Sequence, residues 1–162
     1  MQEIQTIITP VDFSDNAEMI AESAAYTAGK FGAELHLIFV VQNFEDYSGF
    51  FVPPVNLPNL EEELLKSAQQ RMDEFIAEKK EEYLKAGATA VHSKVLTGDV
   101  GEEILKYSEE ILCNLIIMGT HGYKGLERIM FGSVADKVVK NACCPVMTIN
   151  PYRKACEEAQ KP

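Results

Sequence analysis

The sequence lacks an apolar run long enough to cross a membrane, and it lacks a signal for export. A transmembrane helix needs roughly 18 consecutive apolar residues, whereas the longest apolar stretches, at residues 37–41 and 115–118, are only of strand length. The amino terminus has no basic segment followed by an apolar one, which a secretory signal peptide requires. We therefore expect a cytoplasmic protein that does not interact with membranes.

Cysteine and histidine are scarce and show no metal-binding spacing. No C-x-x-C pair and no zinc-finger spacing to histidine occur among the four cysteines, which are Cys113, Cys143, Cys144 and Cys156. Reduced thiols in a reducing compartment are the ordinary interpretation. His36 and His92 fall in expected strands and have no metal-ligand companions in the sequence, so no metal site is predicted.

Positive charge is also in short supply. Fifteen lysines and arginines against twenty-five aspartates and glutamates give a net charge of −10, which would repel the phosphate backbone of a nucleic acid. Nucleic-acid binding is therefore disfavoured. With 162 residues and no repeat or low-complexity tract, the chain has the size of one globular domain with its own core.

What the sequence does contain is an alternation of short apolar segments with longer segments of helical period. This alternation is typical of a parallel sheet covered by helices on both faces. We predict five strands, at residues 4–9, 35–41, 90–96, 115–118 and 146–149. The third strand alternates apolar and polar residues, so it is expected at an edge of the sheet with one face in water.

Local signals mark the predicted helices. Ser14 is the expected N-cap of the first helix. The apolar stripe of that helix is predicted to consist of Ile20, Ala24, Ala28 and Phe31. The second helix is expected at residues 60–85. Asp99, with Glu102 three residues later, resembles a capping box that begins the third helix.

Two segments depart from this alternation. Residues 42–59 contain three prolines, which forbid a regular element, and four aromatic residues, so a loop or lid is predicted there. Residues 151–162 form a polar tail. The predicted organisation is thus one domain at residues 1–150 with a variable loop at residues 42–59, followed by a polar C-terminal tail.

A glycine pattern follows the fourth predicted strand. Open parallel sheets bind ligands outside the carboxyl ends of their strands, where the strand order reverses, and residues 9–12, 40–41 and 119–122 are expected there. The last segment continues as Gly119-x-x-Gly122 and, nine residues later, Gly132-Ser133. Glycine lets backbone N–H groups approach an anion, and the amino end of the next helix favours phosphate. The pattern therefore predicts a phosphate-binding loop.

The same residues carry a family resemblance. Residues 114–149, with Gly119-Thr120-His121-Gly122 and Gly132-Ser133-Val134-Ala135, resemble the universal stress protein family, and the likeness covers nearly the whole chain. The resemblance implies a five-stranded parallel sheet in the order 3-2-1-4-5 and a homodimer. The glycine pattern resembles that of the branch that binds ATP, with any Mg²⁺ or Mn²⁺ held by the phosphates.

The resemblance also implies which residues form the site. Asp12 and the backbone at Val41 would contact the adenine and ribose, although a turn carboxylate is the alternative role for Asp12. The ribose and phosphates would be held by Gly119, Gly122, Gly132 and Ser133. The remaining implied contacts are Pro10, Val11, Thr120, His121 and Val134.

Three functions remain open from the sequence. The first is an ATP-binding stress-response or regulatory protein with little or no hydrolysis, since the chain has no Gly-Lys-Ser or Gly-Lys-Thr P-loop and no nucleophile beside a base. The second is a slow ATPase or nucleotidyl-transferring enzyme, for which His121 is the only candidate base. The third is a nucleotide-free interaction module that meets an unknown protein partner through its aromatic segment at residues 44–51.

The final predicted strand suggests the dimer interface. In the implied strand order it lies at an edge of the sheet, and it carries no lysine, internal proline or charge. An apolar edge with unpaired backbone groups invites another strand. We therefore predict a homodimer formed through Val146–Ile149, the alternative being a C-terminal tail that covers this edge.

Overall fold

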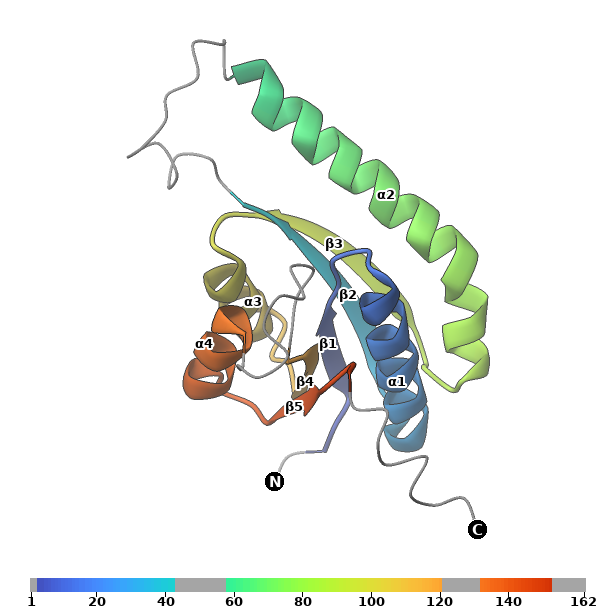
Figure 1. The fold of residues 1–162 in the computed structure, drawn as a ribbon. Coiled ribbons are helices and arrows are strands. Elements are labelled where there is room, and N and C mark those ends of the chain that lie inside the picture. Colours follow the sequence, from blue (N-terminus) through green and yellow to red (C-terminus); the bar gives the residue numbers. More distant parts are fainter. Residues whose placement is uncertain (1–2, 43–57, 121–131, 153–162) are drawn as a thin grey trace.

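A computed structural model describes residues 3–42, 58–120 and 132–152 of the chain, drawn in Figure 1. The predicted loop at residues 42–59 and the predicted tail at residues 151–162 therefore lie mostly outside the described residues. Strands and helices alternate in the order β1 (Thr6–Pro10), α1 (Asp15–Phe31), β2 (Glu34–Val41), α2 (Pro58–Lys85), β3 (Val91–Thr97), α3 (Val100–Glu110), β4 (Leu115–Gly119), α4 (Ser133–Asn141) and β5 (Val146–Ile149).

The five strands form one parallel sheet in the order β3-β2-β1-β4-β5, which confirms the predicted order. The chain builds outward from β1 through β2 to β3 and then crosses to the other side of β1 to add β4 and β5. Strand order thus reverses between β1 and β4, and a crevice outside the carboxyl ends of these two strands is where such sheets bind ligands.

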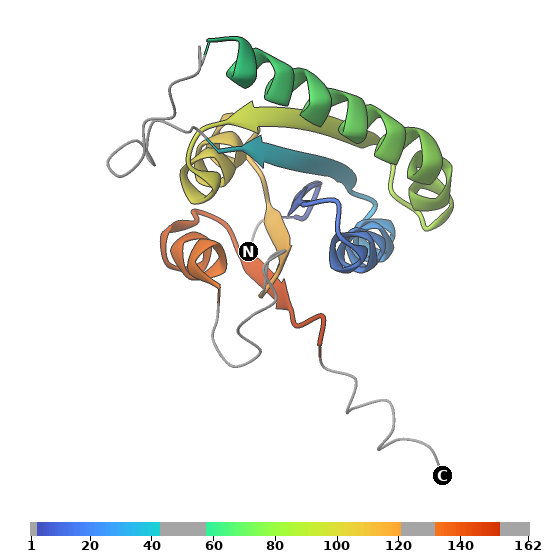
Figure 2. The same ribbon diagram turned by 45° about the horizontal axis from the view of Figure 1, so that its top comes forward.

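Helices cover both faces of the sheet (Figures 1 and 2). α1 and α2 lie on one face, and α3 and α4 lie on the other. Side chains alternate along each strand, so neighbouring residues such as Ile7 and Ile8 enter different cores. This two-sided burial explains why β1, β2 and β4 carry apolar residues on both faces.

The helix caps agree with the sequence analysis. The Ser14 hydroxyl accepts a hydrogen bond from the Ala17 N–H and caps α1, and the Asp99 carboxylate accepts one from the Glu102 N–H and caps α3. One prediction for α1 is wrong. Phe31, in its last turn, is 50% exposed, because the helix ends there and the chain turns away at Gly32, which adopts a left-handed conformation with φ of 66°.

The prediction for β1 is also wrong in one detail. Pro10 is the last residue of β1 and does not lie beyond it. A proline is compatible with a strand end, because it removes a backbone donor only at the last position of the ladder. The next residue restores the pairing, since the Val11 N–H donates to the Ile38 carbonyl at 2.8 Å.

α1 meets the turn that follows α2 at a close contact between two glycines. A Cβ built on Gly29 would lie 2.9 Å from the Gly87 Cα and even closer to the Ala86 carbonyl oxygen. Gly87 itself has a φ of 111°, a conformation in which only glycine is unstrained. The contact lies at the amino end of the sheet, between the end of α1 and the turn that leads into β3.

No helix within the described ranges is both long and apolar enough to cross a membrane. The longest one, α2, presents charged residues along its outer side and buries only a narrow stripe that includes Ala68, Met72 and Tyr83.

Candidate functional site

The turn after β1 forms the first wall of the candidate site at the carboxyl edge of the sheet. The Asp12 carboxylate accepts hydrogen bonds from the backbone N–H of Ser14 at 3.1 Å and from its hydroxyl, both through Oδ1. The turn-carboxylate role considered for Asp12 is therefore present. Because both bonds use the same oxygen, this role leaves Asp12 Oδ2 as a further acceptor.

Phe13 holds this turn in place. Its φ of 60° is unusual for a residue with a side chain, and its ring packs against Phe39 at 4.7 Å and Phe75 at 6.1 Å between centroids. The Arg71 guanidinium lies over the ring of Phe13, 4.8 Å from its centroid. Contacts from β2 and α2 thus fix the backbone that presents Asp12.

The ends of β2 and β3 form a second wall. The Val41 carbonyl accepts a hydrogen bond from the Gly98 N–H at 3.0 Å. Beside this pair lies an open cavity of about 260 Å³ that is lined by Val41, Glu61, Glu62, Leu65 and Thr97. Two carboxylates on its rim make this wall unfavourable for phosphate and favourable for groups that donate hydrogen bonds.

The third wall combines the end of β4 with the start of α4. The Thr120 N–H donates to the Ile149 carbonyl at 2.9 Å, and the Thr120 carbonyl accepts from the Gly132 N–H at 2.8 Å. The two residues that flank residues 121–131 are therefore bonded to each other. Gly132 is the N-cap of α4 and provides no side-chain cap, so the amides of Ser133 and Val134 begin the helix without a capping partner on the N-cap residue.

A charged cluster ties α3 to α4 next to this wall. Lys137 Nζ contacts Asp99 Oδ1 at 2.9 Å and Glu102 Oε1 at 3.0 Å. The pKa of the Asp99 carboxyl is lowered, first by the hydrogen bond from the Glu102 N–H and then by Lys137. Because two carboxylates already engage Lys137, this lysine serves to join the two helices.

The structure brings most of the predicted site residues to this one edge of the sheet. They are Pro10, Val11, Asp12, Val41, Gly119, Thr120, Gly132, Ser133 and Val134. Gly122 and His121 lie outside the described residues, so their predicted roles remain predictions.

One cluster at the other end of the sheet was missed from the sequence. Glu34 and His36 on β2 and His92 on β3 place their metal-ligating atoms within 4.8 Å of one another, so the expectation that the two histidines have no metal-ligand companions is wrong. His36 and His92 are far apart in the sequence, and only the pairing of β2 with β3 makes them neighbours. The local signal was Glu34-x-His36, which puts two ligand types on one face of a strand.

The sheet order, the two helical layers and the reversal of strand order between β1 and β4 define an open, doubly wound α/β protein. The chain belongs to the universal stress protein family, whose model matches residues 3–150. A universal stress protein of Methanocaldococcus jannaschii is 37% identical over 149 residues, which cover 91% of this chain and 83% of that protein.

Solved structures share the fold. The universal stress protein UspA from Lactobacillus plantarum superimposes with a TM-score of 0.78 at 23% identity, and the match covers 93% of this chain and 100% of that one. A universal stress protein from Archaeoglobus fulgidus, solved in complex with dAMP, has a TM-score of 0.62 at 22% identity, and the match covers 92% of this chain and 100% of that one.

Proposed function

We propose that this protein binds ATP at the carboxyl edge of its sheet and acts as a regulatory protein with little or no hydrolysis. The observation that carries the proposal is the start of α4. There a helix without a side-chain cap begins at Gly132, directly beside the point at which strand order reverses. Amides that receive no cap from the N-cap residue and the positive end of the helix dipole make such a helix start suitable for phosphate oxygens.

Two of the other helices support this assignment by contrast. α1 and α3 begin with a capping side chain, Ser14 and Asp99 respectively, whereas α4 begins with a glycine. A capping side chain at position 132 would occupy the amides and the space that a phosphate group needs. Glycine is therefore the residue expected where the ligand itself completes the helix start.

The adenine end is assigned to the wall formed by β2 and β3. The carboxylates of Glu61 and Glu62 border the cavity at Val41 and would attract the amino group of adenine while repelling phosphate. The Val41 carbonyl accepts one bond from Gly98 and has a second lone pair for another donor. The nucleotide would thus run from Val41 to Ser133, with Asp12 near the ribose.

The dAMP complex of the Archaeoglobus fulgidus protein supports an adenine nucleotide, because that protein has the same fold. Mg²⁺ or Mn²⁺ would accompany ATP as ions held by its phosphates. We expect slow hydrolysis at most, because in the described part of the site Asp12 is engaged in a turn and Lys137 in ion pairs. The enzyme alternative depends on His121, and the bound state would be read by a protein partner.

The proposal is tested with a matched pair of substitutions at the start of α4. Both Gly132→Asp and Gly132→Asn place a capping side chain on the helix, and the φ of −60° and ψ of 146° at Gly132 suit either residue. Only aspartate adds a negative charge. Near a protein surface, a like charge about 4 Å away costs about 4 kcal/mol, so we expect ATP to bind Gly132→Asp at least about 100-fold more weakly than Gly132→Asn.

Isothermal titration calorimetry with the full chain measures these affinities, and unfolding in urea shows whether both variants remain folded. We expect the parent protein to bind ATP with micromolar to sub-millimolar affinity. Equal affinities in the two variants would place the phosphates elsewhere. No heat from the parent at millimolar ATP, with no nucleotide released from freshly purified protein, would favour the nucleotide-free interaction module.

We also propose a homodimer through β5. This strand lies at the edge of the sheet, and Met147 is 43% exposed. The Ile116 N–H donates to the Pro145 carbonyl, and the Thr120 N–H donates to the Ile149 carbonyl. Backbone groups alternate in direction along a strand, so Val146 and Thr148 turn their N–H groups away from β4 and are available to a second chain.

A proline at position 148 tests this interface selectively. Thr148→Pro removes an outward N–H and leaves the ladder between β5 and β4 intact, while Thr148→Ala is the matched control that keeps the N–H. Light scattering should show a dimer for the parent and for Thr148→Ala at tens of micromolar, and a folded monomer for Thr148→Pro. A monomeric parent excludes the dimer, and a dimeric Thr148→Pro moves the interface away from β5.

A further inference from the structure

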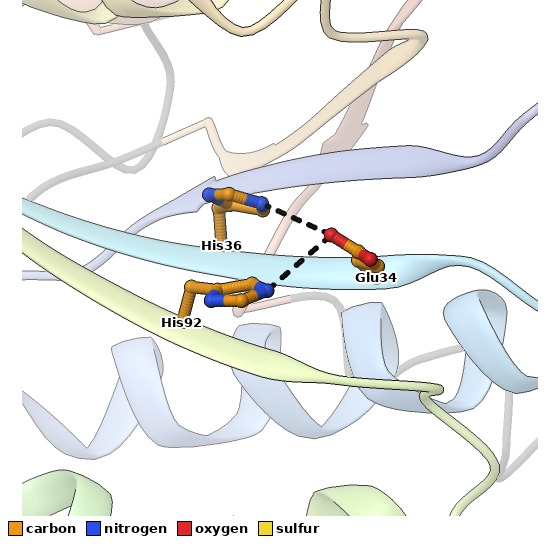
Figure 3. A group of neighbouring side chains, drawn as sticks. All are labelled: Glu34, His36 and His92. Atoms are coloured by element: carbon orange, nitrogen blue, oxygen red, sulfur yellow. Dashed lines mark ion pairs between the residues drawn. The ribbon is translucent and has the colours of Figure 1, made fainter.

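Three potential metal ligands gather at the amino end of β2 and β3, far from the candidate nucleotide site. Figure 3 shows Glu34, His36 and His92 with the Glu34 carboxylate directed between the two imidazole rings. Glu34 Oε2 lies 3.8 Å from His36 Nε2 and 3.3 Å from His92 Nε2. From His36 to Val41, β2 extends about 16 Å at the usual rise per residue, so the two sites are separate.

Strand geometry explains the gathering. Glu34 and His36 are two residues apart on β2 and therefore point to the same face of the sheet. His92 is the direct register partner of His36 on β3, which brings the centroids of the two rings to 4.5 Å. A backbone already fixed by the sheet therefore holds all three side chains on the face that α3 covers.

Tyr107 of α3 orients His36. The Tyr107 hydroxyl lies 3.0 Å from His36 Nδ1, and Tyr107 is buried at 8% exposure. When Nδ1 carries the proton and donates to this hydroxyl, Nε2 presents its lone pair toward Glu34. A second hydrogen bond of this kind is the usual support of a metal-binding histidine, because it fixes the tautomer and the ring.

The charge state of the cluster also suits a cation. Burial is the main cause that lowers the pKa of His36, and the neighbouring His92 lowers it further, against the opposing effect of Glu34. The neutral imidazole is the form that binds a metal ion. Burial, and then the negative charge of Glu110, raises the pKa of the Tyr107 hydroxyl.

Exposure leaves a path for the ion. The His36 side chain is only 13% exposed, whereas His92 and Glu34 are 48% and 49% exposed. The inner ligand is thus fixed, and the two outer ligands are free to adjust from solvent. Four ligands around a tetrahedral zinc ion lie about 3.3 Å apart when the bonds are about 2.0–2.1 Å. The distance from Glu34 Oε2 to His92 Nε2 is 3.3 Å, and the distance to His36 Nε2 is longer, at 3.8 Å.

From this geometry we propose that Glu34 Oε2, His36 Nε2 and His92 Nε2 bind a divalent ion of the zinc type, with water in the fourth position. Two imidazoles and one carboxylate are ligands that Zn²⁺ accepts in proteins. The bound ion would join the edge strand β3 to β2 through side chains.

Zn²⁺ alone, in the absence of nucleotide, is the probe. The full chain is freed of metal with a chelator and kept reduced, and its affinity is measured by competition with a chromophoric chelator. His92→Asn removes an outer ligand at an exposed position. Glu34→Gln removes the charged ligand, and Glu81→Gln, at an exposed residue on α2, is its matched control.

Tyr107→Phe tests the support of His36 without touching a ligand. Loss of such a supporting hydrogen bond typically weakens metal binding by about 10–100-fold. We therefore expect a loss in this range for Tyr107→Phe and a loss of more than about 100-fold for His92→Asn and for Glu34→Gln. Glu81→Gln should bind Zn²⁺ as the parent does, and saturating Zn²⁺ should raise the melting temperature of the parent but not of His92→Asn.

Other outcomes would overturn the proposal. Parent-like affinity in His92→Asn excludes the cluster, and loss of binding in His121→Asn alone would assign the ion to the third histidine of the chain. The remaining alternative is that the cysteines bind the ion. Cobalt tests it, because Co²⁺ bound by thiolates shows an intense charge-transfer band. Such a band in the parent would assign the ion to the cysteines, whereas weaker tetrahedral d–d bands that vanish in His92→Asn support the proposed ligands.

Discussion

The two ends of the sheet differ in the kind of chemical group that they present. At the amino end, side chains and close packing dominate, with the cluster of Glu34, His36 and His92 and the contact between Gly29 and Gly87. At the carboxyl end, the described features are mainly backbone groups, namely the carbonyl of Val41, the amides that begin α4 and the glycines around them.

This difference determines how a site at each end of the sheet can be recognised from the sequence. A site made of backbone groups depends on glycines and on a helix start, which are contiguous in the sequence and are therefore visible as a motif. A site made of side chains from two strands depends on the register between those strands, which no short segment contains. The amino end is also held by packing that tolerates little change, so substitutions there should affect stability more than they affect ligands at the far end.

The largest effect is expected at Gly29. Gly29→Ala places a methyl group against the Ala86 carbonyl and the Gly87 Cα, both of them backbone atoms that cannot move away by changing a rotamer. Overpacking of this kind costs about 1–3 kcal/mol and occasionally more, and we expect the upper part of that range. Unfolding in urea measures the loss.

Gly32→Ala is the matched control for that experiment. Gly32 has a φ of 66°, and no atom lies within 4 Å of the place that a Cβ would take there, so alanine suffers only conformational strain of about 1–2 kcal/mol. A smaller loss for Gly29→Ala than for Gly32→Ala would mean that α1 and the turn before β3 can separate easily. The amino end would then not be the rigid one.

The second effect concerns the first amide of α4. Ser133 occupies the first helical position, where proline is accepted, and Gly132 already has the extended conformation that a residue before proline adopts. Ser133→Pro therefore keeps the helix and removes both the N–H and the hydroxyl, while Ser133→Ala removes the hydroxyl alone. Hydrogen bonds to charged groups contribute about 1.5–3 kcal/mol, so Ser133→Pro should weaken ATP binding about tenfold or more beyond Ser133→Ala.

Calorimetry gives both affinities, and circular dichroism confirms that the helices persist. The same variants should leave Zn²⁺ affinity unchanged, since position 133 and His36 lie at opposite ends of the sheet. Identical ATP affinities for Ser133→Pro and Ser133→Ala would show that the first amide of α4 does not contact phosphate, and the phosphate end of the site would have to be reassigned.

Much of the fold could be predicted from the sequence because its signals are local. Alternating apolar segments locate the five strands, and Ser14 and Asp99 mark the starts of α1 and α3, as the structure confirms. The exposure of Phe31 could not be predicted in the same way. Helical periodicity continues through the last turn, whereas burial there depends on where the chain leaves the core.

The two candidate sites also differ in how far they could be predicted from the sequence. The glycine pattern and the order of the strands place Asp12, Val41 and Gly132 at one edge, because parallel strands bring their carboxyl ends together. The sequence alone did not predict the metal-ligating neighbours of His36, since His92 becomes its neighbour only through the register of β2 with β3. The support from Tyr107 required a further step, the packing of α3 on that face.

The smallest effect concerns the contrast between a capped and an uncapped helix at the carboxyl end. Asp99 caps α3 and also contacts Lys137, and replacing a capping aspartate by alanine typically costs about 1 kcal/mol. The pKa of Asp99 is lowered in the folded state, mainly by the Glu102 N–H. The stabilisation is therefore fully present above the unfolded pKa of about 3.9 and is lost as the pH falls through the folded value.

Three proteins separate the effect of the helix cap on stability from the effect of the charge on Asp99. Asp99→Ala loses both, Asp99→Asn keeps an uncharged cap, and the parent keeps both, so at pH 7 their stabilities in urea should fall in the order parent, Asp99→Asn, Asp99→Ala. Because Asp99 is about half exposed, its pairing with Lys137 should contribute less than the cap. As the pH falls through the lowered pKa of Asp99 in the folded protein, the aspartate becomes protonated and the parent should approach Asp99→Asn. If the gap between these two does not change with pH, the charge on Asp99 does not stabilise α3, and the capped and uncapped helices differ only in hydrogen bonding.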